Sequence, residues 1–367
     1  MVSVPVSHAT RTGLTPVDDG ATQAARAALL VSIERLPIYG LTIELETVTP
    51  VELAEHPGSA LRGALVHALL DTHCTNKAAP SCAACPLVGV CPVSALVAPM
   101  RDDAPRGRDV PRPFVITSPL SQPRLLEAGT VWSFGLTLFG AAAALFPYVV
   151  LAHRRLEANG LGQRSESGRR GRVRVRRIAT DTGEGSVPLY EPDSARVTAP
   201  APTAVAARIT GRAAALAPDR ATLRFLSPMR LKSGGVVLTR PQASVLVHRI
   251  LERWEGLRRE YGRADGVDPL APLRGPAPVG AQGDTRALLA VADTVMVGRD
   301  DTRWVDLASY SSRQRRFTPI GGFVGEATLI GEVNALSEVL ALGEVIHAGK
   351  DVVKGNGHYE MVGLPDQ

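Results

Sequence analysis

The chain has 367 residues, of which 45% are apolar and 21% are charged, so it carries enough apolar side chains for one large core or two ordinary ones. A disordered or fibrous protein is excluded over most of this length. The formal net charge of +5 is small, and only the placement of the charges can indicate a polyanionic partner.

No targeting or membrane segment stands out in the sequence. The first 30 residues lack a basic start followed by an apolar stretch. The apolar run at 135–152 is barely long enough to cross a bilayer and contains Pro147, so it is more typical of a strand followed by a helix. We therefore expect a cytoplasmic protein without a membrane span.

The first half of the chain predicts an N-terminal domain over 36–190, after a disordered leader over 1–35 that shows no apolar periodicity. Apolar and polar residues alternate from Leu41 to Leu45 as in a half-buried strand, and an apolar stripe after Ser59, a predicted helix cap, indicates a helix. The predicted elements are, in order, a strand at 38–48, a helix at 58–73, a cysteine-bearing loop at 74–92, a strand at 131–140 and a helix at 145–158.

The second half repeats this order. A proline-rich stretch at 191–205 has no apolar periodicity and predicts a linker, and a second domain follows over 206–363. The elements expected in it are a strand at 221–231, a helix at 241–261, strands near 302–308 and 320–331, a helix at 333–342 and a final strand at 344–362. Two copies of a βαββαβ unit account for both halves, so the expected fold class is α+β.

Glycines and lysines gather after the last predicted helix. Lys350 and Lys354 lie among Gly349, Gly355 and Gly357. Glycine lets backbone N–H groups approach a phosphate closely, and lysine supplies the charge. The spacing matches neither a Walker loop nor a dinucleotide fingerprint, so a tight hairpin and an anion-binding loop both remain open.

A second polar group lies in the segment 302–326. Tyr310 precedes Arg313, Arg315 and Arg316, and a Gly-Gly step follows. Arginine binds phosphate through two parallel hydrogen bonds, so a cluster of this kind suits a polyanion.

Three segments of the second half together carry a resemblance: 223–235 (LRFLSPMRLKSGG), 302–326 (TRWVDLASYSSRQRRFTPIGGFVGE) and 343–359 (GEVIHAGKDVVKGNGHY). In order and spacing they resemble the CRISPR-associated endoribonucleases that process precursor crRNA, which belong to the repeat-associated mysterious protein (RAMP) superfamily. The first half agrees in outline. LRGAL at 61–65, the cysteine-bearing loop and GLG at 160–162 are similar to the large, cysteine-containing branch of that family.

The resemblance implies two tandem ferredoxin-like (RRM-like) domains that bind CRISPR repeat RNA and cut the precursor transcript within its repeats. It also implies chemistry without a metal ion: the 2′-OH beside the scissile phosphate attacks it and leaves a 2′,3′-cyclic phosphate and a 5′-OH. The alternative, from a different functional class, is a non-catalytic crRNA-binding subunit that works with other subunits of a CRISPR effector complex.

Such a reaction needs a general base, and imidazole titrates in the right range. His67 lies in the first predicted helix, in the region where this family commonly carries its catalytic histidine, and His347 lies close to Lys350. Either histidine is a candidate for the base, and Tyr310 is a candidate to share the proton transfer.

Arginine alternates with valine along another predicted strand. Arg172, Arg174 and Arg176 place one basic face opposite one apolar face. A solvated edge strand and an RNA-binding track both fit this pattern, and we favour the RNA track.

All four cysteines of the chain, Cys74, Cys82, Cys85 and Cys91, lie in one short loop. Disulfides are disfavoured in the cytoplasm, whereas four thiolates suit a tetrahedral metal site. We expect a structural zinc ion; an iron–sulfur cluster and the absence of any metal are the alternatives.

Overall fold

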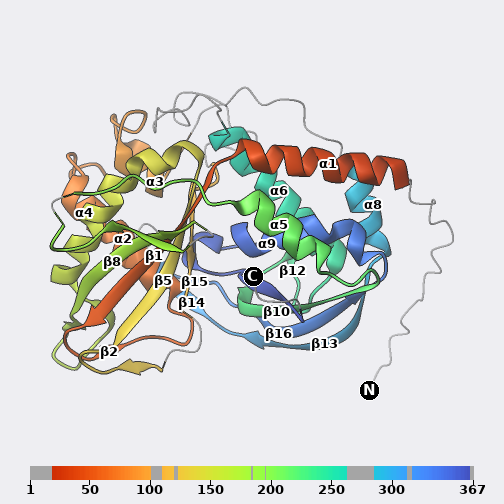
Figure 1. Cartoon of the computed structure of the whole chain (residues 1–367). Coiled ribbons are helices and arrows are strands. Elements are labelled where there is room, and N and C mark those ends of the chain that lie inside the picture. Colours follow the sequence, from red (N-terminus) through yellow and green to blue (C-terminus); the bar gives the residue numbers. More distant parts are fainter. Residues whose placement is uncertain are drawn as a thin grey trace, which may run out of the picture.

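The computed structural model describes residues 19–100, 110–119, 123–182, 185–194, 196–262, 285–311 and 316–363, and it places one large antiparallel sheet in each half of the chain (Figure 1). The strand order is β3-β5-β1-β8-β9 in the first sheet and β13-β16-β10-β17 in the second. Apart from β9, each sheet places its first strand in sequence between the third and the fourth, as ferredoxin-like units do. The predicted α+β class with two tandem ferredoxin-like units is confirmed.

The N-terminal sheet forms around β1, whose apolar residues alternate into the core. Leu41, Ile43 and Leu45 are each at most 3% exposed, and β1 pairs with β5 on one side and β8 on the other. The strands are β1 (Ile38–Thr47), β3 (Phe114–Thr117), β5 (Val131–Phe139), β8 (Val173–Asp181) and β9 (Ser186–Tyr190), with short strands β2 (Val51–Glu52), β4 (Leu125–Leu126), β6 (Leu161–Arg164) and β7 (Arg170–Gly171). The helices are α2 (Gly58–His73), α3 (Pro92–Val97) and α4 (Phe146–Asn159), with 3-10 helices η1 (Cys82–Ala84) and η2 (Gly140–Leu145).

The apolar run at 135–152 divides between β5, η2 and α4, as a strand followed by a helix. Among the described residues, none of the helices combines the length and the apolar character that a bilayer crossing requires.

The C-terminal sheet has β10 at its centre, between β16 and β17. Its strands are β10 (Arg220–Met229), β13 (Met296–Val305), β16 (Gly322–Ile330) and β17 (Tyr359–Val362), and two hairpins join β11 (Lys232–Ser233) to β12 (Val236–Val237) and β14 (Ala308–Ser311) to β15 (Arg316–Pro319). The helices are α5 (Val205–Ala214), α6 (Ala243–Tyr261), α8 (Arg286–Thr294) and α9 (Ser337–Ile346), with 3-10 helices η3 (Val333–Leu336) and η4 (Val352–Lys354).

The predicted final strand at 344–362 is wrong for most of its length. Helix α9 continues to Ile346, where its apolar side chains are fully buried, and His347 then adopts φ 58°. Only residues 359–362 pair with β10. The glycine-rich segment between them is therefore a loop with its own short helix η4.

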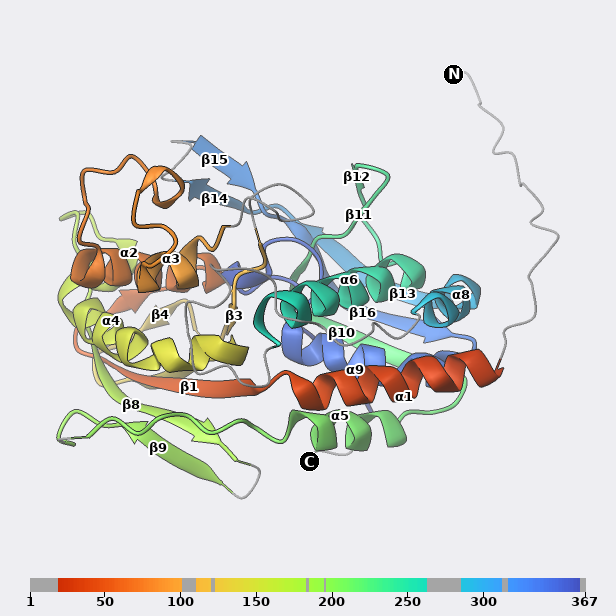
Figure 2. The ribbon, with the colours of Figure 1, turned by 90° about the horizontal axis from the view of Figure 1, so that it is seen from above.

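The leader predicted to be disordered contains helix α1 (Asp19–Arg35), which lies across the C-terminal domain (Figures 1 and 2). Ala25, Leu29 and Ile33 recur every four residues, and this apolar stripe is buried in the C-terminal core. Arg26 makes two hydrogen bonds to the Glu338 carboxylate, at 2.8 and 2.7 Å. The prediction is wrong for 19–35, and residues 1–18 lie outside the described part.

Leu29→Ala is expected to lower the free energy of unfolding by about 2–5 kcal/mol, because truncation of a buried leucine leaves a cavity. Leu29 is 6% exposed, whereas Val31 on the same helix is 46% exposed. Val31→Ala is the matched control and should change stability by about 0.5 kcal/mol or less. Urea unfolding followed by circular dichroism measures both variants. Equally small effects on the free energy of unfolding would support the prediction that this segment is disordered.

Candidate nucleic-acid interface

The glycine-rich segment between α9 and β17 belongs to the C-terminal domain and packs against the N-terminal domain. Helix η4 packs against α2 and β3 of the N-terminal domain, and Val353 contacts the N-terminal core. A Cβ at Gly58 would overlap the carbonyl oxygen of Lys354, and a Cβ at Gly355, where φ is +81°, would lie 2.7 Å from Ser118 Oγ. The two backbones approach this closely only because glycine lies on both sides of the contact.

The backbone of this loop is already hydrogen bonded. The N–H groups of Lys350, Lys354, Gly355 and Gly357 donate to backbone carbonyls at 2.8–3.1 Å. The amide cradle for phosphate is therefore wrong at these four residues, since their N–H groups serve the packing of the loop. Lys354 Nζ lies 2.9 Å from Asp351 Oδ1, which leaves Lys350, whose side chain is exposed, as the cation of the loop that can meet an anion.

His347, a candidate base, lies in the interior. It is 1% exposed, its ring stacks on His358 with centroids 4.7 Å apart, and its Nε2 lies 3.4 Å from Thr117 Oγ1. Burial, and then the neighbouring His358, lower the pKa of His347 well below its ordinary value. A side chain so enclosed is out of reach of an RNA strand, so a role of His347 as the base is not supported.

His67, the other candidate, is exposed on α2. It lies nine residues after Gly58, which is about 14 Å along the helix axis. Gly58 marks the closest contact with the C-terminal loop, so His67 is two and a half turns away from that contact.

A histidine that the sequence did not single out, His56, lies directly before α2, where the two domains meet. Its Nε2 is buried, has no hydrogen-bond partner among the described residues and lies 3.8 Å from Glu55 Oε1. The same Glu55 oxygen accepts a hydrogen bond of 3.4 Å from Arg303 of β13. Burial lowers the pKa of His56, Arg303 adds to this effect and Glu55 opposes it, so the imidazole is neutral at pH 7.

Gly58 is the sequence feature that could have indicated the neighbourhood of His56. A glycine at the first position of a helix, where other residues are preferred, indicates that another backbone passes close by. Gly58 follows His56 by two residues, but which segment approaches it depends on tertiary structure.

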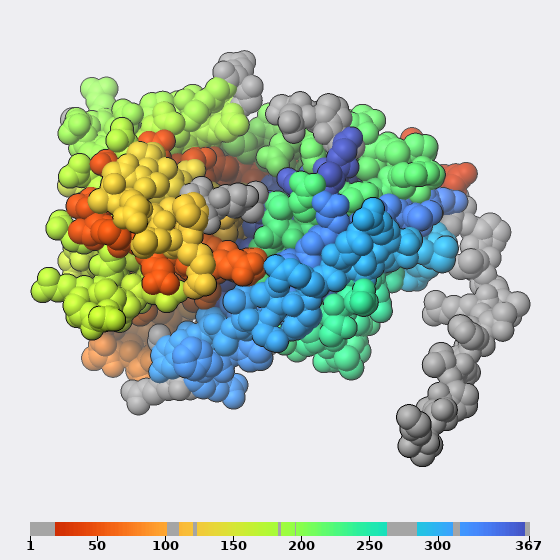
Figure 3. Space-filling view, turned by 90° about the horizontal axis from the view of Figure 1, so that it is seen from below, coloured from red at the N-terminus to blue at the C-terminus, as the bar shows by residue number. Residues whose placement is uncertain are grey.

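The hairpin β14–β15 extends from the C-terminal domain to the N-terminal domain. Ser309 Oγ lies 2.7 Å from Ser59 Oγ of α2, and Figures 2 and 3 show the hairpin beside the cysteine-bearing segment drawn in orange. Tyr310 is 54% exposed and Phe317 is 70% exposed, with ring centroids 5.4 Å apart. Exposed aromatic rings of this kind suit stacking on nucleic-acid bases.

Other predictions for these segments have mixed outcomes. Ser59 makes no helix cap, since Pro57 occupies that position and Ser59 bonds to the hairpin instead. Arg316 is exposed at the start of β15. Arg313 and Arg315 lie outside the described residues.

A largely buried guanidinium group lies beside the loop. Arg62 of α2 is close to Arg112 and to Asp351, and its Nε is buried without a hydrogen-bond partner in the described part of the chain. Burial, and then Arg112, lower the pKa of Arg62 to about 10, while Asp351 opposes them. Adjacent cations of this kind favour an anion between them.

The basic strand β8 has the two faces that its sequence predicts. Arg172, Arg174 and Arg176 are exposed, and the valines between them are buried. Arg176 lies 3.5 Å from Glu44 and 3.4 Å from Glu46 of the neighbouring strand, which neutralise it. Arg172 and Arg174 have no carboxylate partner among the described residues and remain candidates for an RNA track.

The four cysteines are gathered but are not arranged as metal ligands. All four are free thiols of intermediate exposure. Burial raises the pKa of the Cys82 thiol, and the nearby thiols Cys91, Cys74 and Cys85 raise it further, so the three lie around Cys82. Within the described residues, no three His, Cys, Asp or Glu side chains are placed to hold one metal ion. The donor set of four neighbouring thiols suits zinc, and the prediction of a structural zinc ion stays a prediction.

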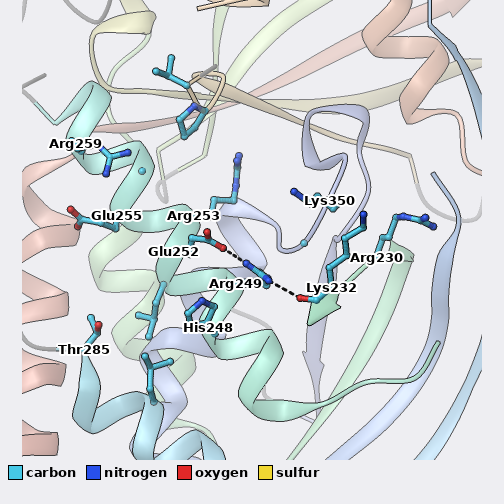
Figure 4. Close-up of a pocket in the computed structure, with 16 residues that line it drawn as sticks. Arg230, Lys232, His248, Arg249, Glu252, Arg253, Glu255, Arg259, Thr285 and Lys350 are labelled. Atoms are coloured by element: carbon cyan, nitrogen blue, oxygen red, sulfur yellow. Dashed lines mark hydrogen bonds and ion pairs between the residues drawn. The ribbon is translucent and has the colours of Figure 1, made fainter. Parts of the chain in front are cut away.

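A basic pocket lies at the other end of the loop, against α6 (Figure 4). We call it the α6 pocket. Gly349 lines it with φ +83°, where a Cβ would lie 2.6 Å from the Arg230 carbonyl oxygen, and Lys350 lines it next to Gly349. The loop therefore contacts this pocket at one end and the start of α2, beside His56, at the other.

Comparison with known proteins agrees with this architecture. Residues 223–359 match the family model of the CRISPR-associated endoribonuclease Cas6. The C-terminal domain is therefore similar to Cas6 endoribonucleases. Residues 36–202 match a family described as an N-terminal domain, and no curated relative matches the sequence.

Solved Cas6 structures have a similar fold. A partial Cas6-RT-Cas1–Cas2 complex is 14% identical with a TM-score of 0.51, over 90% of this chain and 47% of that chain. A Thermus thermophilus Cas6 is 18% identical with a TM-score of 0.46, over 89% of this chain and 99% of that chain. A Cas6 product complex is 19% identical with a TM-score of 0.49, over 89% and 100%.

Gly58→Ala is expected to lower the free energy of unfolding by about 1–3 kcal/mol, because the added methyl group overlaps the Lys354 carbonyl. Gly63, in the same helix, has open space around its Cβ position. Gly63→Ala is the control and should raise stability by about 0.5–1 kcal/mol through helix propensity. Urea unfolding measures both variants, and a neutral Gly58→Ala would contradict the close contact.

Proposed function

We propose that the chain cuts CRISPR precursor transcripts within their repeats, by attack of a ribose 2′-OH on the adjacent phosphate and without a metal ion in the chemistry. The products are a 2′,3′-cyclic phosphate and a 5′-OH. The observation that carries the proposal is the neutral His56 imidazole with an unpartnered Nε2, beside Arg303, where the two domains meet. The Cas6 family model over 223–359 supports the reaction class.

His56 is the general base of this mechanism. In the free protein this Nε2 is buried, so RNA binding has to turn the imidazole toward the strand. Nε2 then takes the proton from the 2′-OH while the 2′ oxygen bonds to phosphorus and the bond from phosphorus to the 5′ oxygen breaks. Burial keeps the imidazole neutral at pH 7, so the base is ready without prior deprotonation. The leaving 5′ oxygen takes a proton from the phenol of Tyr310, which follows Ser309 beside α2.

Arg303 stabilises the negative charge that builds up on the phosphorane oxygens. Its side chain is 67% exposed, and its hydrogen bond to Glu55 is long, at 3.4 Å. The guanidinium can therefore turn from Glu55 to a phosphate with little loss. Bases that stack on the rings of Tyr310 and Phe317 no longer stack on each other, and the RNA strand is held in this open geometry.

The nuclease and the non-catalytic RNA-binding subunit give different results in one assay. The purified protein is incubated in EDTA with RNA that carries a CRISPR repeat from its own genome. A single cut with a cyclic phosphate end supports the nuclease, and a 2′-deoxy nucleotide before the cut should abolish cleavage and leave binding intact. Tight binding of the all-ribose RNA without a cut would support the subunit.

His56→Gln is expected to slow single-turnover cleavage by about 10²–10⁴-fold, with RNA affinity little changed, because it removes a general base but no phosphate contact. In the parent protein the rate constant should be flat near pH 7 and fall as pH drops through the lowered His56 pKa, below 6.5. The variant should lack this acid limb. His67→Gln is the control and should cut at a near-normal rate; the opposite ranking of the two variants would place the base at His67.

We also propose that the four cysteines bind a structural zinc ion, with iron–sulfur as the alternative outcome. The support is the donor set and the gathering of three thiols around Cys82. Elemental analysis of the purified protein should give about one zinc per chain, and Cys82→Ser should lose it and melt at lower temperature. A protein without zinc or iron, with Cys82→Ser as stable as the parent, would contradict the site.

A further inference from the structure

The α6 pocket has no part in the chemistry proposed above. Its volume is about 510 Å³, within the range of small-ligand sites. Six cationic side chains line it, and Figure 4 shows those of α6 facing those of the β10–β11 segment and the loop across it. The six are Arg230, Lys232, Arg249, Arg253, Arg259 and Lys350.

The positive charge of the pocket is only partly balanced. Two acidic residues line it, Glu252 and Glu255. Glu252 forms an ion pair with Arg249 at 2.5 Å. Glu255 forms an ion pair at 2.8 Å with Arg258, which does not line the pocket. Lys232 and Lys350 have no carboxylate partner in the described part of the chain. The pocket therefore attracts an anion.

Arg253 lies in the pocket with an unused hydrogen-bond donor. Its Nε donates to the Ile346 carbonyl at 2.8 Å, while its Nη2 is buried with no partner among the described residues. Burial lowers the pKa of Arg253 to about 10. A guanidinium that is buried without an anion is costly, and a phosphate oxygen would supply the missing acceptor.

The walls of the pocket are fixed by hydrogen bonds before any ligand binds. Arg249 Nη2 donates to the Lys232 carbonyl at 2.6 Å, and the Lys350 N–H donates to the Arg230 carbonyl at 3.0 Å. The cations thus need little reordering on binding, which favours affinity. Val110, Pro111, Leu251 and Leu289 add apolar surface that a nucleobase or ribose can contact.

The pocket and the His56 site lie at opposite ends of one short loop. Gly349 and Lys350 line the pocket, and Lys354 contacts Gly58 at the start of α2. Six residues span at most about 20 Å even when fully extended. One RNA strand with a phosphate every 3.4 Å or so therefore reaches both sites within about six nucleotides.

We propose that the α6 pocket binds a backbone phosphate and its nucleotide in the same RNA strand, within about six nucleotides of the cut linkage. This inference rests on the proposed function, and it assigns to the C-terminal domain a binding site that is separate from the chemistry. The pocket fixes which linkage of the strand reaches His56.

The test measures how RNA affinity depends on salt. Fluorescence anisotropy follows binding of repeat RNA with a 2′-deoxy nucleotide before the cut, across a KCl series. Lys232→Gln and Lys350→Gln should each weaken binding and reduce the slope of log K against log salt by about 0.7, the value for one phosphate contact with a single strand. Lys232→Arg should restore the slope. Arg240→Gln is the control, because Arg240 is 69% exposed, pairs with Asp300 and lies outside the pocket.

Two further arms separate the outcomes. Unchanged slopes in both lysine variants would overturn the pocket proposal. The second arm measures binding of uridine monophosphate or adenosine monophosphate to the pocket. If Lys232→Gln abolishes this binding while the RNA slopes stay unchanged, the pocket is a site for free nucleotides instead. Cleavage of all-ribose RNA is measured on the same protein. Normal cleavage with unchanged slopes would overturn the pocket alone, whereas reduced slopes without any cleavage would overturn the nuclease and leave the pocket as an RNA site.

Discussion

The close contact between Gly58 and the carbonyl of Lys354 is the constraint on which the rest of the site depends. It seats a loop of the C-terminal domain on the first helix of the N-terminal domain, and any side chain at position 58 would separate them. Helix α1 makes the reverse connection, since it precedes the N-terminal domain but is buried in the C-terminal core. The two domains are therefore held together at both ends of the chain, and the groups at their junction keep a fixed geometry.

This constraint explains why glycines are abundant in the loop although the loop does not form an amide cradle. Gly355 and Gly357 adopt positive φ and pack against backbone or hydroxyl groups, and their N–H groups are hydrogen bonded within the protein. We propose that the charge that meets RNA comes from side chains instead: Arg303 beside His56, and Lys350 with Lys232 at the α6 pocket. Backbone packing positions these cations, and in this proposal the cations bind the RNA.

Local periodicity made much of the fold predictable from sequence. The alternation through β1 and β8 and the apolar stripe of α2 gave elements that the structure confirms, because burial of one face needs only the local pattern. Helix α1 was missed because its stripe of Ala25, Leu29 and Ile33 is narrow and becomes significant only against the C-terminal core. The final strand was overextended because the loop before β17 also buries apolar residues, Ala348 and Val352, which local pattern alone does not distinguish from residues of a buried strand.

The sequence predicted which types of residue the site contains, but not which individual residues come together in it. The sequence indicated that a histidine, a tyrosine, arginines and a glycine-lysine loop were present, but it could not show that His347 is buried under His358 or that His67 lies about 14 Å from the loop contact. His56 became a candidate only when Arg303, nearly 250 residues later in the chain, was found beside it. Burial and long-range contacts, which decide among chemically equal residues, are properties of the folded chain.

The most direct measurement is an experimental structure of the protein bound to its CRISPR repeat RNA with a 2′-deoxy nucleotide before the cut. The account predicts that the scissile phosphate lies beside the Arg303 guanidinium and that the position of the missing 2′ oxygen lies within about 3.2 Å of His56 Nε2. A scissile linkage bound at His67, or on a face remote from the junction of α2, β13 and the loop, would contradict it.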